Sequence, residues 1–166
     1  MENFSEITFC RVERFRIARY VIISPNPESD VCSYMDGWAK SSGLLDYPGY
    51  VPRRIGWDFP TFSEQLDSMG LRGYVSAFII PADFKPACEG ADMGYVEADN
   101  YAMITVTDPF SRPFELIPEG YHRVFDYIEN HRIGAKEHES RICFEEVRVE
   151  NNVTYMDIYI PVDKKI

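Results

Sequence analysis

Two adjacent glutamates near the C-terminus, Glu145 and Glu146, are the residues whose type and position point most directly to chemistry. They lie within residues 141–149, a segment of β-branched and aromatic residues that predicts a β-strand. Because side chains alternate between the two faces of a strand, one of the two carboxylates must point into whatever the sheet covers. A carboxylate among apolar groups is costly without a cation, so such an acid suits a cation-selective pocket or a general acid or base with a raised pKa.

Of the two acids, we predict that Glu145 faces the pocket, with Glu146 as the alternative. A shift of one residue in the strand register would exchange them. If the protein is an enzyme, Glu145 is also the predicted catalytic group, and the sequence leaves open whether it is one. A surface acid paired with Arg148 or Arg141 is the simpler structural explanation.

The composition supplies aromatic partners for such an acid, because the chain holds 11 Tyr, 11 Phe and 2 Trp in 166 residues. A phenol suits the half-solvated wall of a pocket better than a dry core. For each single aromatic residue, packing in the core is an equally good explanation. A lid formed by Phe110 and Phe114 is a further possibility. The predicted ligand-binding residues besides Glu145 are Trp57, Tyr74, Phe78, Tyr101, Phe110, Tyr155, Asp157 and Tyr159.

The elements that must position these residues occur twice in the same order, strand, helix, strand, strand. In the first set the helix begins at Ser29 or Asp30 and carries an apolar stripe that continues to about Lys40. In the second set Pro118 is predicted in the first helical turn, and a polar Glu-Asn-Asn turn joins the last two strands. The matching segments are 19–23 with 100–104, 34–38 with 124–128, 54–58 with 141–145, and 78–83 with 158–163.

This repeat predicts an α+β fold for a single domain, residues 1–166, built from a half at about 5–86 and a half at about 93–166. Each half is too small to bury its own sheet, so we expect the halves to pair about a pseudo-two-fold axis. The helices would then cover one sheet face, and the other face would form a ligand groove. In this alignment Glu145 is the counterpart of Asp58.

The charge balance narrows the class of partner. Asp and Glu outnumber Lys and Arg 27 to 17, which gives a net charge of −10 at pH 7. Nucleic acids and anionic membranes are therefore poor partners, whereas cationic small molecules or basic protein surfaces suit this charge. A solvated acidic surface that maintains solubility is the more ordinary explanation.

Metal ions and cofactors are not predicted. The four cysteines lack CxxC spacing, no glycine-rich phosphate loop is present, and we expect His122, His131 and His138 at the surface. The chain shows neither a signal peptide at its N-terminus nor an apolar segment of the roughly 18 residues that a membrane span needs. These features predict a cytoplasmic protein.

Several short motifs, in this order and spacing, resemble the GyrI-like family. The Tyr101-Ala102 pair is similar to the Tyr-Ala step of the family, the Phe144-Glu145 pair to its Phe-Glu step, and residues 158–162 to its closing strand. Residues 56–60 and the later Gly73-Tyr74 pair resemble one stand-alone branch. The resemblance spans nearly the whole chain, and it rests on the order and spacing of these motifs.

The resemblance implies an aromatic groove with a central glutamate, here Glu145, that binds lipophilic, cationic small molecules. It also implies two alternatives, which are a hydrolase that detoxifies cyclopropane-type DNA-alkylating compounds and a protein that binds DNA gyrase or a regulator. Family members form the effector-binding domains of AraC-type and MerR-type transcription regulators. This sequence shows no helix-turn-helix region, so we expect no direct contact with DNA.

Overall fold

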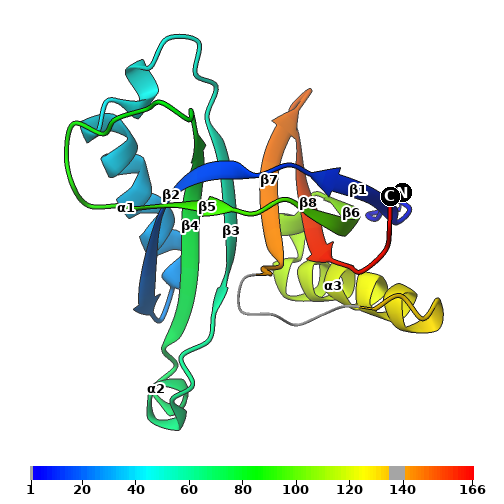
Figure 1. Cartoon of the computed structure of the whole chain (residues 1–166). Coiled ribbons are helices and arrows are strands. Elements are labelled where there is room, and N and C mark those ends of the chain that lie inside the picture. The colour runs from blue at the N-terminus through cyan, green and yellow to red at the C-terminus, as the bar shows by residue number, and fades with distance from the viewer. Residues whose placement is uncertain (1, 135–140) are drawn as a thin grey trace. The chain divides into compact units, whose positions relative to one another are not determined.

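The computed structural model describes residues 2–134 and 141–166, and it shows a mixed α+β fold (Figure 1). The chain divides into two compact units, unit 1, which combines Met1–Arg14 with Glu97–Ile166, and unit 2, which is Phe15–Val96. These units differ from the predicted halves at both boundaries. The strand Thr8–Val12, at the start of the first half, pairs with Asp99–Thr107, and the strand Asp92–Val96, at the start of the second half, pairs with Phe15–Ser24. Among the predicted surface histidines, His138 lies outside the described residues.

Unit 2 is an antiparallel sheet with one long helix packed on it. Its strands follow the order β3-β4-β2-β5 across the sheet. A second, short helix lies between β3 and β4 along the chain (Figure 1). The elements of this unit are β2 (Phe15–Ser24), α1 (Pro27–Ser41), η1 (Leu44–Asp46), β3 (Arg53–Phe59), α2 (Glu64–Ser68), β4 (Arg72–Ile80) and β5 (Asp92–Val96).

Helix α1 begins at Pro27, earlier than the predicted start at Ser29 or Asp30. Proline is favoured in the first helical turn, where its missing N–H would have no partner within the helix. The predicted apolar stripe is buried at Val31, Met35 and Trp38. These side chains pack with Phe78 and other residues of β2 and β4, so the core of unit 2 lies between α1 and one face of the sheet.

Unit 1 repeats this arrangement, with its strands in the order β1-β6-β8-β7. Helix α3 packs on one face of the sheet, against β6 and β8. The elements of this unit are β1 (Thr8–Val12), β6 (Asp99–Thr107), η2 (Pro109–Ser111), α3 (Pro113–Asn130), β7 (Phe144–Glu150) and β8 (Val153–Pro161).

Helix α3 begins at Pro113, so the prediction that Pro118 opens this helix is wrong by more than one turn. Pro118 lies inside the helix at an exposed position. Gly120 is buried against the sheet, and a Cβ atom there would lie 2.9 Å from Ile158 Cδ1 and 3.0 Å from Val106 Cγ2. The glycine therefore permits a close approach of the helix to β6 and β8.

The hairpin of β7 and β8 turns through Asn151 and Asn152, which both have positive φ angles, 51° and 62°. Asparagine tolerates this backbone region better than most residues, and two such residues form the turn that best matches strand twist. The pairing of Glu150 with Val153 closes the turn and fixes the register of the whole hairpin.

The repeat of strand, helix, strand, strand is present as β2-α1-β3-β4 and as β6-α3-β7-β8. Strand pairing corrects its alignment, because Arg54 lies opposite Phe78 whereas Glu145 lies opposite Ile158. If Phe78 matches Ile158, then Arg54 is the counterpart of Glu145, and the predicted match with Asp58 is wrong. Composition alone could not reveal this shift, since both segments mix aromatic and charged residues.

None of the described helices combines the length and apolar character that crossing a membrane requires.

Candidate functional site

Glu145 lies on the face of the unit 1 sheet that α3 covers. The Tyr121 hydroxyl of α3 donates a hydrogen bond of 2.9 Å to Glu145 Oε2. Across the hairpin, Glu145 lies opposite Ile158, a fully buried residue of the core beneath α3. The prediction that Glu145 shares a face with Tyr155 and Tyr159 is therefore wrong.

Glu146, the alternative acid, lies on the sheet face that points away from α3. It is directly opposite Asp157 on β8, and residues paired directly across antiparallel strands share a face. Both side chains are buried, with exposed fractions of 8% for Glu146 and 6% for Asp157. Two carboxylates thus lie side by side on this face.

Asp157 lies on the same face as Tyr155 and Tyr159, the placement expected if the helix covers Met156, Ile158 and Ile160. Its carboxylate accepts a hydrogen bond of 2.6 Å from Thr105 Oγ1 on β6 and one of 2.7 Å from Arg148 Nε on β7. The hydrogen bond to Asp157 raises the pKa of the Arg148 guanidinium above its ordinary value. Arg148 is therefore a permanent cation that pairs with Asp157.

Aromatic rings surround this pair of acids. The rings of Phe144 and Tyr159 stack at 4.6 Å between centroids, and Tyr101 packs edge-on against both, at 5.3 Å and 5.9 Å. The Arg148 guanidinium lies 4.7 Å from the centroid of the Tyr155 ring. We call this surface the tyrosine face, and it consists of Tyr101, Thr105, Phe144, Glu146, Arg148, Tyr155, Asp157 and Tyr159.

Tyr101 is the most deeply buried phenol of the tyrosine face, with 2% of its surface exposed. Burial, followed by the nearby Asp99 carboxylate, raises the pKa of Tyr101 above its ordinary value, against a smaller opposite effect of Arg141. The Tyr101 hydroxyl therefore keeps its proton and remains a hydrogen-bond donor at neutral pH.

The remaining predicted site residues lie elsewhere. Tyr74 and Phe78 belong to the core of unit 2 beneath α1, where the Arg54 guanidinium lies 4.6 Å from the Phe78 ring centroid. Trp57 is buried on the opposite face of that sheet, because it pairs with Val75 rather than with a residue under α1. Phe110 lies in η2 and is half exposed.

The structure thus brings Tyr101, Tyr155, Asp157 and Tyr159 together on one face, and it separates them from Glu145. Sequence reasoning missed Arg148, Phe144 and Thr105 as members of the site. The sequence did indicate Arg148, because it lies two residues after Glu146 in the same strand and therefore points to the same sheet face. Within residues 2–134 and 141–166, no group of three or more His, Cys, Asp or Glu side chains is arranged to hold a metal ion.

The tyrosine face can attract a cation without forming a covalent bond to it. Two carboxylates lie among its eight residues, and its rings offer negative π-faces to a positive group. A buried, partly apolar setting strengthens both attractions relative to bulk water.

Comparison with solved structures identifies the fold. The isolated C-terminal domain of EcmrR matches with a TM-score of 0.66 at 10% identity, covering 96% of this chain and 98% of that one. SAV2435, solved bound to tetraphenylphosphonium, matches with a TM-score of 0.55 at 13% identity, covering 96% of this chain and 94% of that one. The chain has the GyrI-like fold.

Two further structures share the GyrI-like fold with this chain. EcmrR in complex with DNA matches with a TM-score of 0.68 at 9% identity, covering 98% of this chain but 59% of the EcmrR chain, so this chain spans little more than half of that protein. A hydrolase from Listeria innocua matches with a TM-score of 0.58 at 9% identity, covering 95% of this chain and 92% of that one. No family model matches the sequence, and no curated protein matches it.

Proposed function

We propose that this chain is a small-molecule-binding protein of GyrI-like fold whose tyrosine face receives lipophilic cations. The observation that carries the proposal is the pair of buried carboxylates, Glu146 and Asp157, side by side among aromatic rings. Proteins rarely bury two acids together in a sheet, because each charge loses its hydration there. A positive group on this face would lie close to both acids and to the negative π-faces of the rings.

The chemistry of the face favours a large, apolar cation over a small, hydrated one. Each ring that contacts the cation contributes roughly 0.5–2 kcal/mol, depending on how fully the cation is desolvated. A small inorganic cation would keep its water shell and lose this contribution. A cation that spreads its charge over apolar groups enters the site at a lower desolvation cost.

Support for this ligand class comes from a protein of the same fold. SAV2435 was solved bound to tetraphenylphosphonium, which is a lipophilic monovalent cation. The sequence of that protein is only 13% identical to this one, so the likeness establishes the shared fold, and the ligand class is our inference for this chain.

Thermal shift measurements on the intact protein test the proposal. We expect tetraphenylphosphonium to raise the melting temperature in a saturable manner, because a ligand that binds only the folded state stabilises it. An uncharged tetraaryl compound of similar size, used at its solubility limit, is the control that lacks the positive charge. Equal stabilisation by the charged and uncharged compounds, or by neither, would contradict the proposed role of the acids.

Hydrolysis on the same face is a second candidate, favoured by the Listeria innocua hydrolase of similar fold. In this scheme Glu146 would orient or deprotonate a water molecule, and a tyrosine hydroxyl would hydrogen-bond the leaving group. Incubation with a cyclopropane-bearing alkylating compound, followed by mass spectrometry, tests it. Product formation that continues unchanged in Glu146→Gln would exclude this role for the acid.

A further inference from the structure

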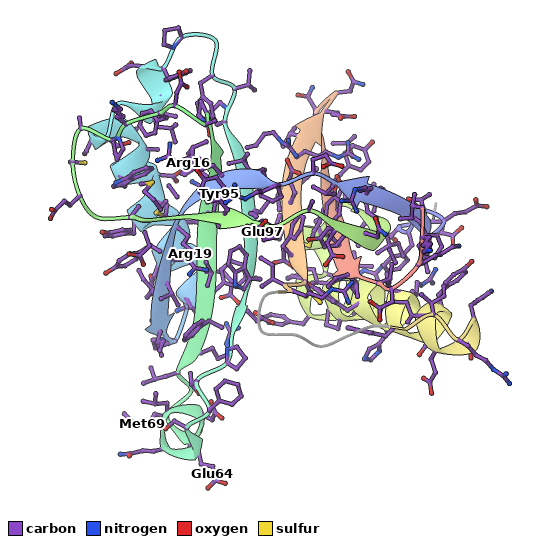
Figure 2. The ribbon with its side chains drawn as sticks, viewed as in Figure 1. Arg16, Arg19, Glu64, Met69, Tyr95 and Glu97 are labelled. Carbon is purple, nitrogen blue, oxygen red and sulfur yellow. The ribbon has the colours of Figure 1, made fainter. Side chains whose placement is uncertain are left out.

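The connection between β3 and β4 differs from its counterpart in the repeat. In unit 1 the equivalent strands β7 and β8 are joined by the two-residue turn at Asn151 and Asn152. In unit 2 residues 60–71 take this place and include helix α2. We call residues 60–71 the β3–β4 tip, and Figure 2 shows its residues Glu64 and Met69 beyond the ends of the strands that it connects.

The tip is held in a defined conformation by its own hydrogen bonds. Ser63 Oγ accepts a hydrogen bond of 3.3 Å from the Leu66 backbone N–H, which caps the start of α2. Thr61 Oγ1 donates a hydrogen bond of 2.8 Å to Asp67 Oδ1, and the Leu71 N–H bonds the Leu66 carbonyl at 3.0 Å. Helix α2 nevertheless buries none of its residues, so this structure does not serve the core.

Large apolar side chains are displayed on this tip. Phe62 is 94% exposed and Met69 is 62% exposed. Next to the tip, Ile23 and Phe59 are also exposed, and they flank Gly73 on neighbouring strands. The φ angle of Phe62 is 51°, a conformation that costs roughly 1–2 kcal/mol in an aromatic residue. An ordered element that bears this cost while exposing its aromatic ring is typical of a contact surface.

The charge around these side chains indicates the kind of partner. Residues 58–71 contain Asp58, Glu64 and Asp67 and no Lys or Arg. The next residue, Arg72, is engaged by Glu28 through hydrogen bonds of 2.7 Å and 3.1 Å. A second copy of a chain with net charge −10 and an anionic membrane are both repelled by such a surface. A protein segment that combines basic and apolar side chains complements it.

We propose that the β3–β4 tip docks a basic, amphipathic segment of a partner protein. Phe62 and Met69 contact the apolar side chains of that segment, and Glu64 and Asp67 face its Lys and Arg residues. Exposed aromatic anchors with a charged surround are the usual composition of a small protein interface, in which apolar contacts supply affinity and charges guide association. This surface belongs to unit 2, whereas the tyrosine face belongs to unit 1.

A synthetic helical peptide of leucine and lysine, labelled with fluorescein, is the probe for this proposal. We expect fluorescence anisotropy to show binding to the full chain, weakened about tenfold by Phe62→Ser combined with Met69→Ser. Phe114→Ser is the matched control, because Phe114 is 93% exposed at the start of α3 in unit 1. The control should change affinity by less than about twofold, and a leucine and glutamate peptide should not bind.

The outcomes separate the alternatives. Absence of peptide binding would overturn the proposal. Equal loss of affinity in the tip variant and in Phe114→Ser would also overturn it, because the peptide would then bind without preference for the tip. Sedimentation that shows a dimer of the wild-type chain, lost in Phe62→Ser, would also overturn it by assigning the tip to a second copy. All variants alter exposed side chains, and circular dichroism verifies that they remain folded.

Discussion

At the scale of single residues, two adjacent glutamates have opposite environments. The Glu145 side chain bonds Tyr121 beneath α3, whereas Glu146 lies beside Asp157 on the tyrosine face. The sequence predicted that one of the two acids points into whatever the sheet covers, because alternation along a strand is a local property. It could not show which acid, because that depends on the face that the distant helix α3 covers.

Arg148 should stabilise the folded chain by balancing Asp157. In Arg148→Met the buried Asp157 carboxylate loses its partner cation and keeps the hydrogen bond from Thr105. We expect the free energy of unfolding to fall by about 2–3 kcal/mol, less than for a wholly buried pair because Arg148 is partly exposed. Urea denaturation measures this change.

Arg112→Met is the matched control for Arg148→Met, because Arg112 forms an exposed ion pair with Glu115. It should change the free energy of unfolding by less than about 1 kcal/mol. Equal changes in the free energy of unfolding would show that the pair of Arg148 and Asp157 stabilises the chain no more than an exposed ion pair does.

Tyr101 should make stability fall at alkaline pH. Burial raises its folded pKa above the unfolded value of about 10, so the unfolded chain loses this proton first as pH rises. The stabilisation is complete below pH 10 and is lost as pH increases through the folded pKa. We expect Tyr101→Phe, which cannot ionise, to flatten the decline in melting temperature above about pH 10. An unchanged slope would contradict the assignment.

At the scale of elements, the apolar stripe of α1 and the turn of the closing hairpin could be predicted from local patterns. Helix starts were less so, because Pro113 and Pro118 are equally suited to a first turn and only packing against the sheet selects between them. The short helix α2 could not be predicted, since it has no buried face and therefore no apolar period to detect.

Substitution by alanine should have opposite effects on stability at two helical glycines. Around Gly37 in α1 a Cβ atom meets nothing within 4 Å, so Gly37→Ala should stabilise the chain by about 1 kcal/mol through helix propensity. At Gly120 a Cβ atom meets Val106 and Ile158, which are both buried. Gly120→Ala should therefore destabilise the chain by about 1–2 kcal/mol through overpacking. Thermal unfolding shows whether each variant is more or less stable than the wild type. Stabilisation by Gly120→Ala would contradict the close packing of α3 on the sheet.

At the scale of the whole molecule, the repeat of strand, helix, strand, strand and the α+β class were predictable, because each half has the same order of periodic segments. The edge strands were not. Strand β1 precedes β2 in sequence but pairs with β6 of unit 1, and β5 precedes β6 but pairs with β2 of unit 2. A segment of five residues carries too little pattern to reveal a partner so distant in the sequence.

This exchange of edge strands predicts which fragments fold. Residues 97–166 alone lack β1 and should remain largely unfolded. Joining residue 166 through a flexible linker to residues 1–14 restores the strand, and both chain termini lie within unit 1 (Figure 1). The C-terminal segment already contacts β1, because Lys164 Nζ lies 3.9 Å from the centroid of the Phe9 ring.

Circular dichroism and cooperative thermal unfolding compare the permuted fragment with residues 97–166. We expect cooperative unfolding of the permuted fragment only. Equal folding of both fragments would show that β1 is dispensable for unit 1.

The most direct test of the proposed site is calorimetric titration of tetraphenylphosphonium into the wild-type protein, Glu146→Gln and Glu145→Gln. The two substitutions remove the same charge from adjacent residues, and a glutamine at position 145 still accepts the hydrogen bond from Tyr121. We predict affinity about tenfold weaker for Glu146→Gln and within about twofold of wild type for Glu145→Gln. Equal losses, or a larger loss for Glu145→Gln, would contradict the placement of the cation on the tyrosine face.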